Sequence, residues 1–117
     1  IVGTHLENEF IDKLKKNDNL HPGLNVKIPR EINIYKFEEF ERILKTDVDL
    51  IVLGISSKGI EWVSDQLHNI YKGSNIPKLL MLTKGLSIHF NNYELLVDKL
   101  ERLLVSKNIT SHSFCIS

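Results

Sequence analysis

The sequence contains little cysteine and no long apolar run. The lone Cys115 excludes an intramolecular disulfide and is typical of a protein in a reducing compartment. No apolar stretch approaches the roughly 18 residues that span a bilayer, and no charged-then-apolar signal peptide opens the chain. We therefore expect a cytoplasmic location and no membrane partner.

An excess of charge of one sign is also missing. The 15 basic residues are balanced by 15 acidic ones, which argues against a nucleic-acid partner because such a partner requires a basic excess or a basic cluster. None of the five histidines is followed by another four residues later, and no GxSxG motif occurs. We therefore expect neither a metal site nor a nucleophile-elbow hydrolase.

The clearest secondary-structure pattern lies in residues 48–86. Leu50–Leu53 is a run of four large apolar residues that stops at Gly54, which predicts a strand buried on both faces. A helix should follow, because apolar residues recur with the helical period at Ile60, Val63, Leu67, Ile70 and Tyr71. Residues 78–82 form a second short apolar run and predict another strand.

A strand, a helix and a strand in this order form a βαβ unit. The two strands of such a unit pair in parallel through a right-handed crossover. The chain ends of the two strands, after Ile55 and after Leu82, should therefore lie side by side at one edge of the sheet. Open α/β sheets bind their ligands at this carboxyl edge.

The remaining sequence predicts further alternation of helices and strands. Before the βαβ unit we expect a helix from about Glu7 to Lys16, a loop from Asn17 to Glu31, a strand at Ile32–Tyr35 and a helix over residues 37–44. After it we expect a linker that follows Lys84 and a helix that begins near Asn91, with a capping box to Glu94, and runs through Leu104. A last strand is expected at Ser113–Ile116. The resulting order predicts a doubly wound α/β fold with a parallel sheet.

The chain contains the segment DLIVLGISSKGIEWVSDQL, which is followed by LLMLTKGL. These segments resemble the fourth strand, and the strand that ends in a T/I-K-G motif, of the cofactor domain of NAD(P)-dependent glycerol-3-phosphate dehydrogenases. The leading IVGTHLENEFIDKL resembles the family's second strand and helix, and LHPGLNVKIPREINIY resembles its "yLPgvklPeni" loop. The resemblance implies hydride transfer between NAD(P)H and dihydroxyacetone phosphate.

The resemblance also implies roles for particular residues. Lys84 matches the lysine of the T-K-G motif, which lies beside the nicotinamide and contacts the hydroxyl-bearing end of the substrate. Ser56 and Ser57 match the Pro-Ser pair that passes the cofactor's ribose, with a serine in place of the proline. Without the resemblance, Lys84 would be a surface lysine. Ser57 is expected both to contact the cofactor and to cap the helix that begins near Lys58.

Thr4 and His5 follow the second strand of the family pattern, where the adenosine ribose should lie. Dinucleotide folds often place an acid here for the 2′-hydroxyl, or an arginine for a 2′-phosphate. Glu7 lies close enough in the sequence to act as this acid, whereas no arginine does. The sequence therefore favours NAD as the cofactor, with NADP as the alternative.

One element of a dinucleotide-binding domain is absent. Its first strand should open into GxGxxG, whose glycines let the backbone approach the pyrophosphate, and none of the six glycines forms this pattern. We therefore expect residues 1–117 to be an incomplete Rossmann-like NAD(P)-binding domain that starts at the second strand and lacks both the first βα unit and the helical substrate domain.

Two classes of function remain open. The first is a fragment of a glycerol-3-phosphate dehydrogenase, or of another hydroxy-acid dehydrogenase of the same superfamily, that is inactive by itself. The second is a non-catalytic α/β interaction or remnant domain. In the 3-2-1-4-5-6 strand order, loss of the first strand exposes two inner strands, so we also expect a homo-oligomer in which neighbouring copies complete the sheet.

Overall fold

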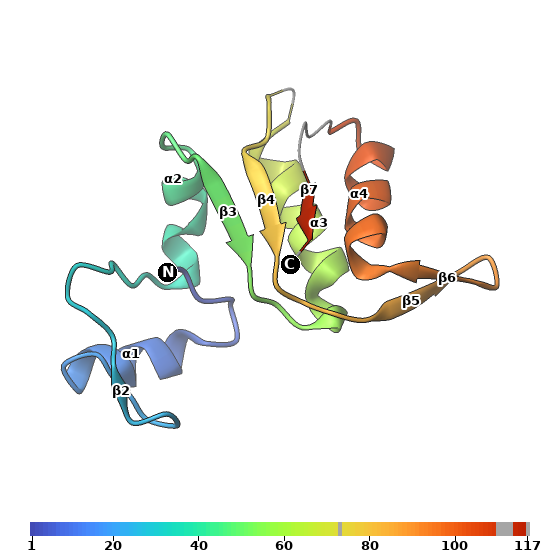
Figure 1. Cartoon of the computed structure of the whole chain (residues 1–117). Helices are drawn as coiled ribbons and strands as arrows, with labels where there is room; N and C mark the ends of the chain where they lie inside the picture. Colours follow the sequence, from blue (N-terminus) through green and yellow to red (C-terminus); the bar gives the residue numbers. More distant parts are fainter. Residues whose placement is uncertain (73, 110–113, 117) are drawn as a thin grey trace. The chain divides into compact units, whose positions relative to one another are not determined.

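The computed structural model describes residues 1–72, 74–109 and 114–116, and it divides the chain into two compact units (Figure 1). Unit 1 contains Ile1–Thr46 and unit 2 contains Asp47–Ser117. Together they form a mixed α/β structure with small sheets. Within the described residues, no helix is both long enough and apolar enough to cross a membrane.

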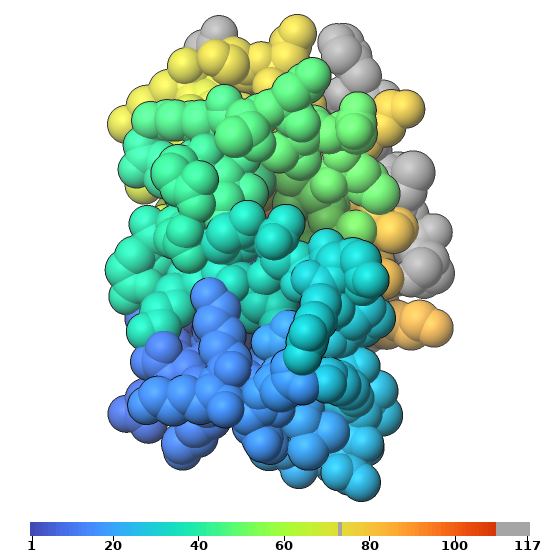
Figure 2. Space-filling view, turned by 90° about the vertical axis from the view of Figure 1, so that its left-hand side faces the viewer, coloured from blue at the N-terminus to red at the C-terminus, as the bar shows by residue number. Residues whose placement is uncertain are grey.

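Unit 1 is built on one amphipathic helix, α1 (Asn8–Lys16). Ile11 and Leu14 lie on its buried face and pack with Ile34 and Ile28. Three lysines in the last turn suit the negative end of the helix dipole. Figure 2 shows unit 1 in blue to cyan, where α1 and the segment that follows it form one continuous surface. The expected first helix is therefore confirmed.

The rest of unit 1 differs from the expectation in two places. The expected loop over residues 17–31 contains a short antiparallel hairpin of β1 (Leu20–His21) and β2 (Val26–Lys27). The expected strand at Ile32–Tyr35 is reduced to a single parallel bridge between Val2 and Tyr35. The unit ends with a 3₁₀ turn, η1 (Phe37–Glu39), and the short helix α2 (Phe40–Leu44).

Unit 2 contains a three-stranded parallel sheet in the order β3-β4-β7. Its strands are β3 (Leu50–Leu53), β4 (Lys78–Met81) and β7 (Phe114–Ile116). Leu50 pairs with Lys78 and Leu53 with Met81, so the two predicted strands of the βαβ unit lie in register along their whole length. Of the expected last strand, Ser113 lies outside the described residues.

Two helices cover one face of this sheet. A 3₁₀ turn, η2 (Ser57–Gly59), leads into α3 (Ile60–Ile70), and α4 (Leu96–Ser106) precedes β7. The crossovers from β3 to β4 and from β4 to β7 run in the same direction along the sheet. Right-handed connections therefore put α3 and α4 on the same face of the sheet, where the two helices pack against each other (Figure 1). Ile60, Leu67, Leu100 and Leu104 are fully buried in this layer.

The second face of the sheet is open along β3. Ile51 and Leu53 point toward the helices and are buried, whereas Leu50 and Val52 are 45% and 50% exposed. The prediction that this strand would be buried on both faces is therefore wrong. A continuous apolar run indicates two covered faces only where helices lie on both sides of the sheet.

An antiparallel hairpin follows β4 where a linker and the start of a helix were expected. It consists of β5 (Leu86–His89) and β6 (Asn92–Leu95), and its turn residues Phe90 and Asn91 have φ angles of +47° and +62°. These angles are typical of the type I′ turn that joins two twisted strands. The capping-box prediction at Asn91 and Glu94 is therefore wrong, and the helix begins five residues later.

Candidate functional site

The carboxyl ends of β3 and β4 lie side by side, as the βαβ pattern predicts. The backbone N–H of Leu82 donates to the carbonyl oxygen of Leu53 at 3.0 Å. One step further along the chain, the hydroxyl of Thr83 donates to the carbonyl oxygen of Ile55. These two hydrogen bonds tie the strand ends together and fix the backbone immediately before Lys84.

Lys84 is exposed at this edge and makes no hydrogen bond or ion pair with any other described residue. Two other lysines of unit 2 are paired: the ammonium of Lys99 lies 2.8 Å from the carboxylate of Glu61, and Lys107 pairs with Asp65. An unpaired ammonium keeps its three N–H donors for a ligand. Lys84 is thus an exposed cation at this strand edge that can bind an anion or a polarised oxygen.

Gly85 makes the turn that leads the chain out of the strand edge. Its φ angle is +142°, a conformation that residues with a side chain rarely adopt. A Cβ atom added here would also lie 3.3 Å from Cδ1 of the buried Leu96. The sequence analysis did not assign this turn conformation to Gly85, although a glycine directly after Thr83-Lys84 is a signal for a turn.

Ser56 and Ser57 follow the neighbouring strand β3 and are both exposed. Ser57 is the first residue of η2, and neither serine side chain caps the turn or the helix behind it. The prediction that Ser57 caps the helix is therefore wrong. The turn closes instead through the backbone, because the N–H of Gly59 donates to the carbonyl oxygen of Ser56 at 2.9 Å. Neither hydroxyl bonds to another described residue.

Thr4 and His5 belong to unit 1, in the turn before α1. The N–H of Thr4 donates to Oε2 of Glu7 at 2.7 Å, and the ring of His5 meets that of Phe37 edge-on with centroids 5.9 Å apart. Glu7, expected to serve a ribose hydroxyl, thus already accepts a hydrogen bond from the backbone. Within unit 2, the predicted site residues at the carboxyl ends of β3 and β4 are Ser56, Ser57 and Lys84.

A charged cluster anchors the hairpin beside the site. Both carboxylate oxygens of Glu94 accept hydrogen bonds from Arg102 of α4, at 2.7 and 3.1 Å, and the hydroxyl of Ser87 donates to Oε1 at 2.9 Å. The hydrogen bonds from Arg102 lower the pKa of Glu94 to about 2, because they stabilise the ionised carboxylate. The carboxylate is therefore charged throughout the physiological range.

The described residues contain no group of three or more His, Cys, Asp or Glu side chains that could hold a metal ion. Neither the protein-family models nor the curated proteins compared with the chain match it. The chemistry of the site is therefore argued from its own residues.

Proposed function

We propose that the chain is part of the cofactor domain of an NAD(P)-dependent glycerol-3-phosphate dehydrogenase. The parallel order β3-β4-β7 supports this assignment, because it corresponds to the fourth, fifth and sixth strands of a doubly wound dinucleotide-binding sheet. In the same scheme, the bridge between Val2 and Tyr35 marks the second and third strands. A part of the parent outside these 117 residues supplies the first strand.

The exposed, unpaired ammonium of Lys84 at the joined carboxyl ends of β3 and β4 is the observation that carries the proposal. Surface lysines occur in all proteins, but this one follows a strand whose end is fixed to its neighbour by Thr83. The carboxyl edge is where α/β sheets bind substrates and cofactors. Position and availability together favour a role in binding or catalysis.

The residues of this chain fit one half of a dinucleotide. The free hydroxyls of Ser56 and Ser57 could hold the ribose of the nicotinamide half. A Cβ atom built on Gly54 would meet no atom within 4 Å, so there is open space where β3 ends. The sequence contains no GxGxxG loop for the pyrophosphate, which the parent must therefore provide elsewhere.

The proposed role of Lys84 is electrostatic. When bound, the cofactor would supply the hydride chemistry at the carbon that bears the substrate oxygen, and the hydroxyls of Ser56 and Ser57 would hold its ribose. As the carbonyl of dihydroxyacetone phosphate is reduced, negative charge develops on that oxygen. The ammonium of Lys84 donates a hydrogen bond to it and stabilises the charge, an effect that typically contributes about 10²- to 10³-fold in rate per donor.

The test is a Lys84→Ala substitution in the full-length parent. We expect kcat/KM for dihydroxyacetone phosphate to fall about 10- to 1000-fold while the affinity for the cofactor is nearly unchanged. Lys78→Ala is the matched control, because Lys78 is an exposed lysine at the opposite end of the same strand, β4. If the two variants had equal kcat/KM, Lys84 would be an ordinary surface lysine and the proposed role would be wrong.

The same assay separates the other dehydrogenases of the superfamily. A panel of hydroxy acids run beside glycerol 3-phosphate identifies the substrate by its kcat/KM. If the parent oxidised none of them and bound no NADH, the chain would belong to a non-catalytic α/β domain and the proposal would be wrong.

A further inference from the structure

One residue, His21, closes the turn of the β1–β2 hairpin. Its ring atom Nδ1 accepts a hydrogen bond from the backbone N–H of Gly23 at 3.2 Å and another from that of Leu24 at 3.1 Å. The backbone N–H of Asn25 donates to the carbonyl oxygen of His21 at 2.9 Å. Pro22 has no N–H, so His21 accepts every backbone hydrogen bond that the four loop residues donate.

These contacts require a neutral His21 ring with its proton on Nε2. A neutral imidazole has one nitrogen that donates and one that accepts, whereas an imidazolium has two donors and no acceptor. Protonation of Nδ1 would therefore break both side-chain hydrogen bonds and set an N–H against two backbone N–H groups. The same two contacts are typical of an asparagine side chain in a turn, whose oxygen accepts at every pH.

The β1–β2 hairpin has little else to keep it closed. Each strand is two residues long, and the two strands are joined by two residue pairs. A short two-stranded hairpin is at best marginally stable in water. At its base, the N–H of Ile28 donates to the carbonyl oxygen of Asn19, and Ile28 packs against the buried core of unit 1. The turn at His21 therefore influences a segment that ends at this core.

We infer that the β1–β2 hairpin is a pH-sensitive element, closed while the ring of His21 is neutral and opened when the ring is protonated. Imidazoles ordinarily change charge between about pH 5 and 8. The open hairpin binds the proton and the closed one excludes it, so the closed form is favoured at high pH and is lost as the pH falls. Loss of two backbone hydrogen bonds corresponds to about a tenfold fall in the ratio of closed to open hairpin.

The groups that face the ring from α1 do not compensate a positive charge on it. Phe10 meets the ring of His21 edge-on, with centroids 5.1 Å apart. The charged residues on the flank of α1 beside Phe10 are Glu9 and Lys13, which carry opposite signs. Neither makes an ion pair with His21. No carboxylate of α1 therefore holds the imidazolium in the closed hairpin.

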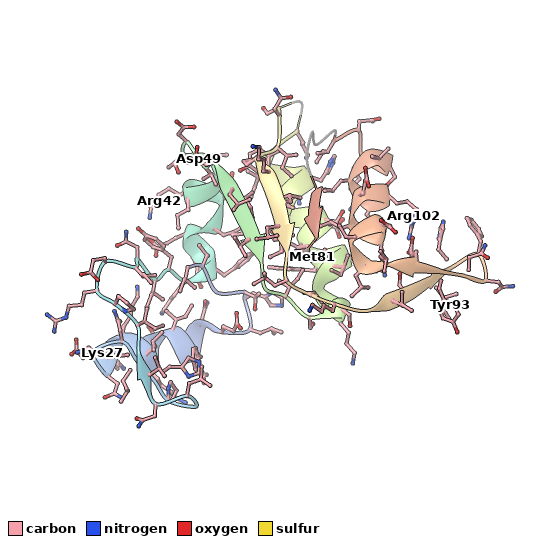
Figure 3. All side chains as sticks on the ribbon, in the orientation of Figure 1. Lys27, Arg42, Asp49, Met81, Tyr93 and Arg102 are labelled. Carbon is pink, nitrogen blue, oxygen red and sulfur yellow. The ribbon has the colours of Figure 1, made fainter. Side chains whose placement is uncertain are left out.

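The charged groups of β2 and its surroundings do not titrate in the same range. Lys27 lies on the face of the hairpin opposite to His21, because it pairs with the residue before His21 (Figure 3). Its ammonium pairs with Asp18, which also binds Arg30 at 3.1 Å. The hydrogen bonds from Lys27 and Arg30 hold the pKa of Asp18 below its usual range, so this carboxylate stays ionised near neutral pH.

The experiment is nuclear magnetic resonance of the ¹⁵N-labelled 117-residue chain between about pH 8 and pH 5. At the upper end we expect His21 to carry its proton on Nε2 and not on Nδ1. The protection factors of the Gly23 and Leu24 amides against hydrogen exchange should fall about tenfold at the lower end. A proton on Nδ1 at the upper end, or protection that is equal at both ends, would overturn the inference.

His21→Asn is the decisive variant, because its side-chain oxygen can accept the same two hydrogen bonds and does not titrate. The Gly23 and Leu24 amides of this variant should stay protected over the whole pH range. A loss of protection as large as in the wild type would mean that another group senses the pH, and the inference would be wrong. If the variant failed to fold, the position of the proton on the wild-type ring would still decide.

His68→Asn is the matched control. His68 lies in α3 of unit 2, and its Nδ1 is buried without a hydrogen-bond partner, so acid can also act on the chain there. We expect the pH response of the Gly23 and Leu24 amides to be the same in this variant as in the wild type. If the substitution abolished that response, the pH sensor would be His68 and the role inferred for His21 would be refuted.

Discussion

The Gly85→Ala substitution should destabilise unit 2. Gly85 has a φ angle of +142°, and an alanine held in this region is strained by about 1–3 kcal/mol. The new methyl group would also lie 3.3 Å from Cδ1 of Leu96, which is 3% exposed and has little room to move. Both effects act in the folded state and in the same direction.

One effect opposes them. Alanine restricts the unfolded chain more than glycine does, which by itself stabilises a protein by about 0.4–1 kcal/mol. The net expectation is a loss of roughly 1–3 kcal/mol in the free energy of unfolding, because strain and crowding together exceed the entropic gain. For a domain of about 60–100 residues, each kcal/mol lowers the melting temperature by about 4–8 °C.

Gly54→Ala is the matched control, since Gly54 directly follows the neighbouring strand β3. A Cβ atom built there meets nothing within 4 Å, and its φ angle lies outside the left-handed region. Urea unfolding followed by far-ultraviolet circular dichroism should show no change or a gain of up to about 1 kcal/mol for this variant. If both variants lost the same stability, or if Gly85→Ala lost none, the conformational argument would be refuted.

Four further outcomes are expected. Thr83→Val should lose about 1–3 kcal/mol in urea unfolding, because it leaves the carbonyl of Ile55 without its donor, and Thr83→Ser should restore most of it. The folded-state pKa of Glu94, about 2, lies below its unfolded value. The contribution of Glu94 to the free energy of unfolding is therefore fully present above the unfolded pKa and is lost as the pH falls through about 2. Arg102→Gln should flatten this dependence of the melting temperature on acid pH. Leu100→Ala should cost about 2–5 kcal/mol in the same unfolding assay, since the side chain is fully buried. Calorimetric titration of the isolated chain with NADH should show binding weaker than the low micromolar range, because no pyrophosphate loop is present.

The central βαβ unit could be predicted from the sequence because its signals agree at every level. The apolar run at Leu50–Leu53 has the length of a strand, and the stripe from Ile60 to Tyr71 has the period of a helix. In the sequence, Gly73 and Pro77 are signals for a turn between the predicted helix and the predicted strand. Handedness then follows from a general rule, so the adjacency of the two strand ends needed no tertiary information.

The β5–β6 hairpin is not predicted if the helical period of α4 is extended backward over its residues. Tyr93 stands three residues before Leu96, which continues the apolar stripe of α4 backward into the hairpin. The competing signal was an alternation of period two, with Leu86 and Ile88 on one side and Ser87 and His89 on the other, followed by asparagines at the turn. Strand pairing decides between the two patterns, and pairing is a tertiary property.

The alternation of side chains along β4 also explains why Thr83 and Lys84 have different roles in the candidate site. Past the end of β4 the side chains continue to alternate: Met81 is buried, Leu82 exposed, Thr83 half-buried and Lys84 exposed. Thr83 therefore turns inward and can reach the carbonyl of Ile55, while Lys84 turns outward to solvent. An insertion of one residue before Thr83 would exchange the two orientations. Topology predicts that polar residues gather at this edge, but the register of β4 against β3 decides which of them holds the backbone and which can reach a ligand.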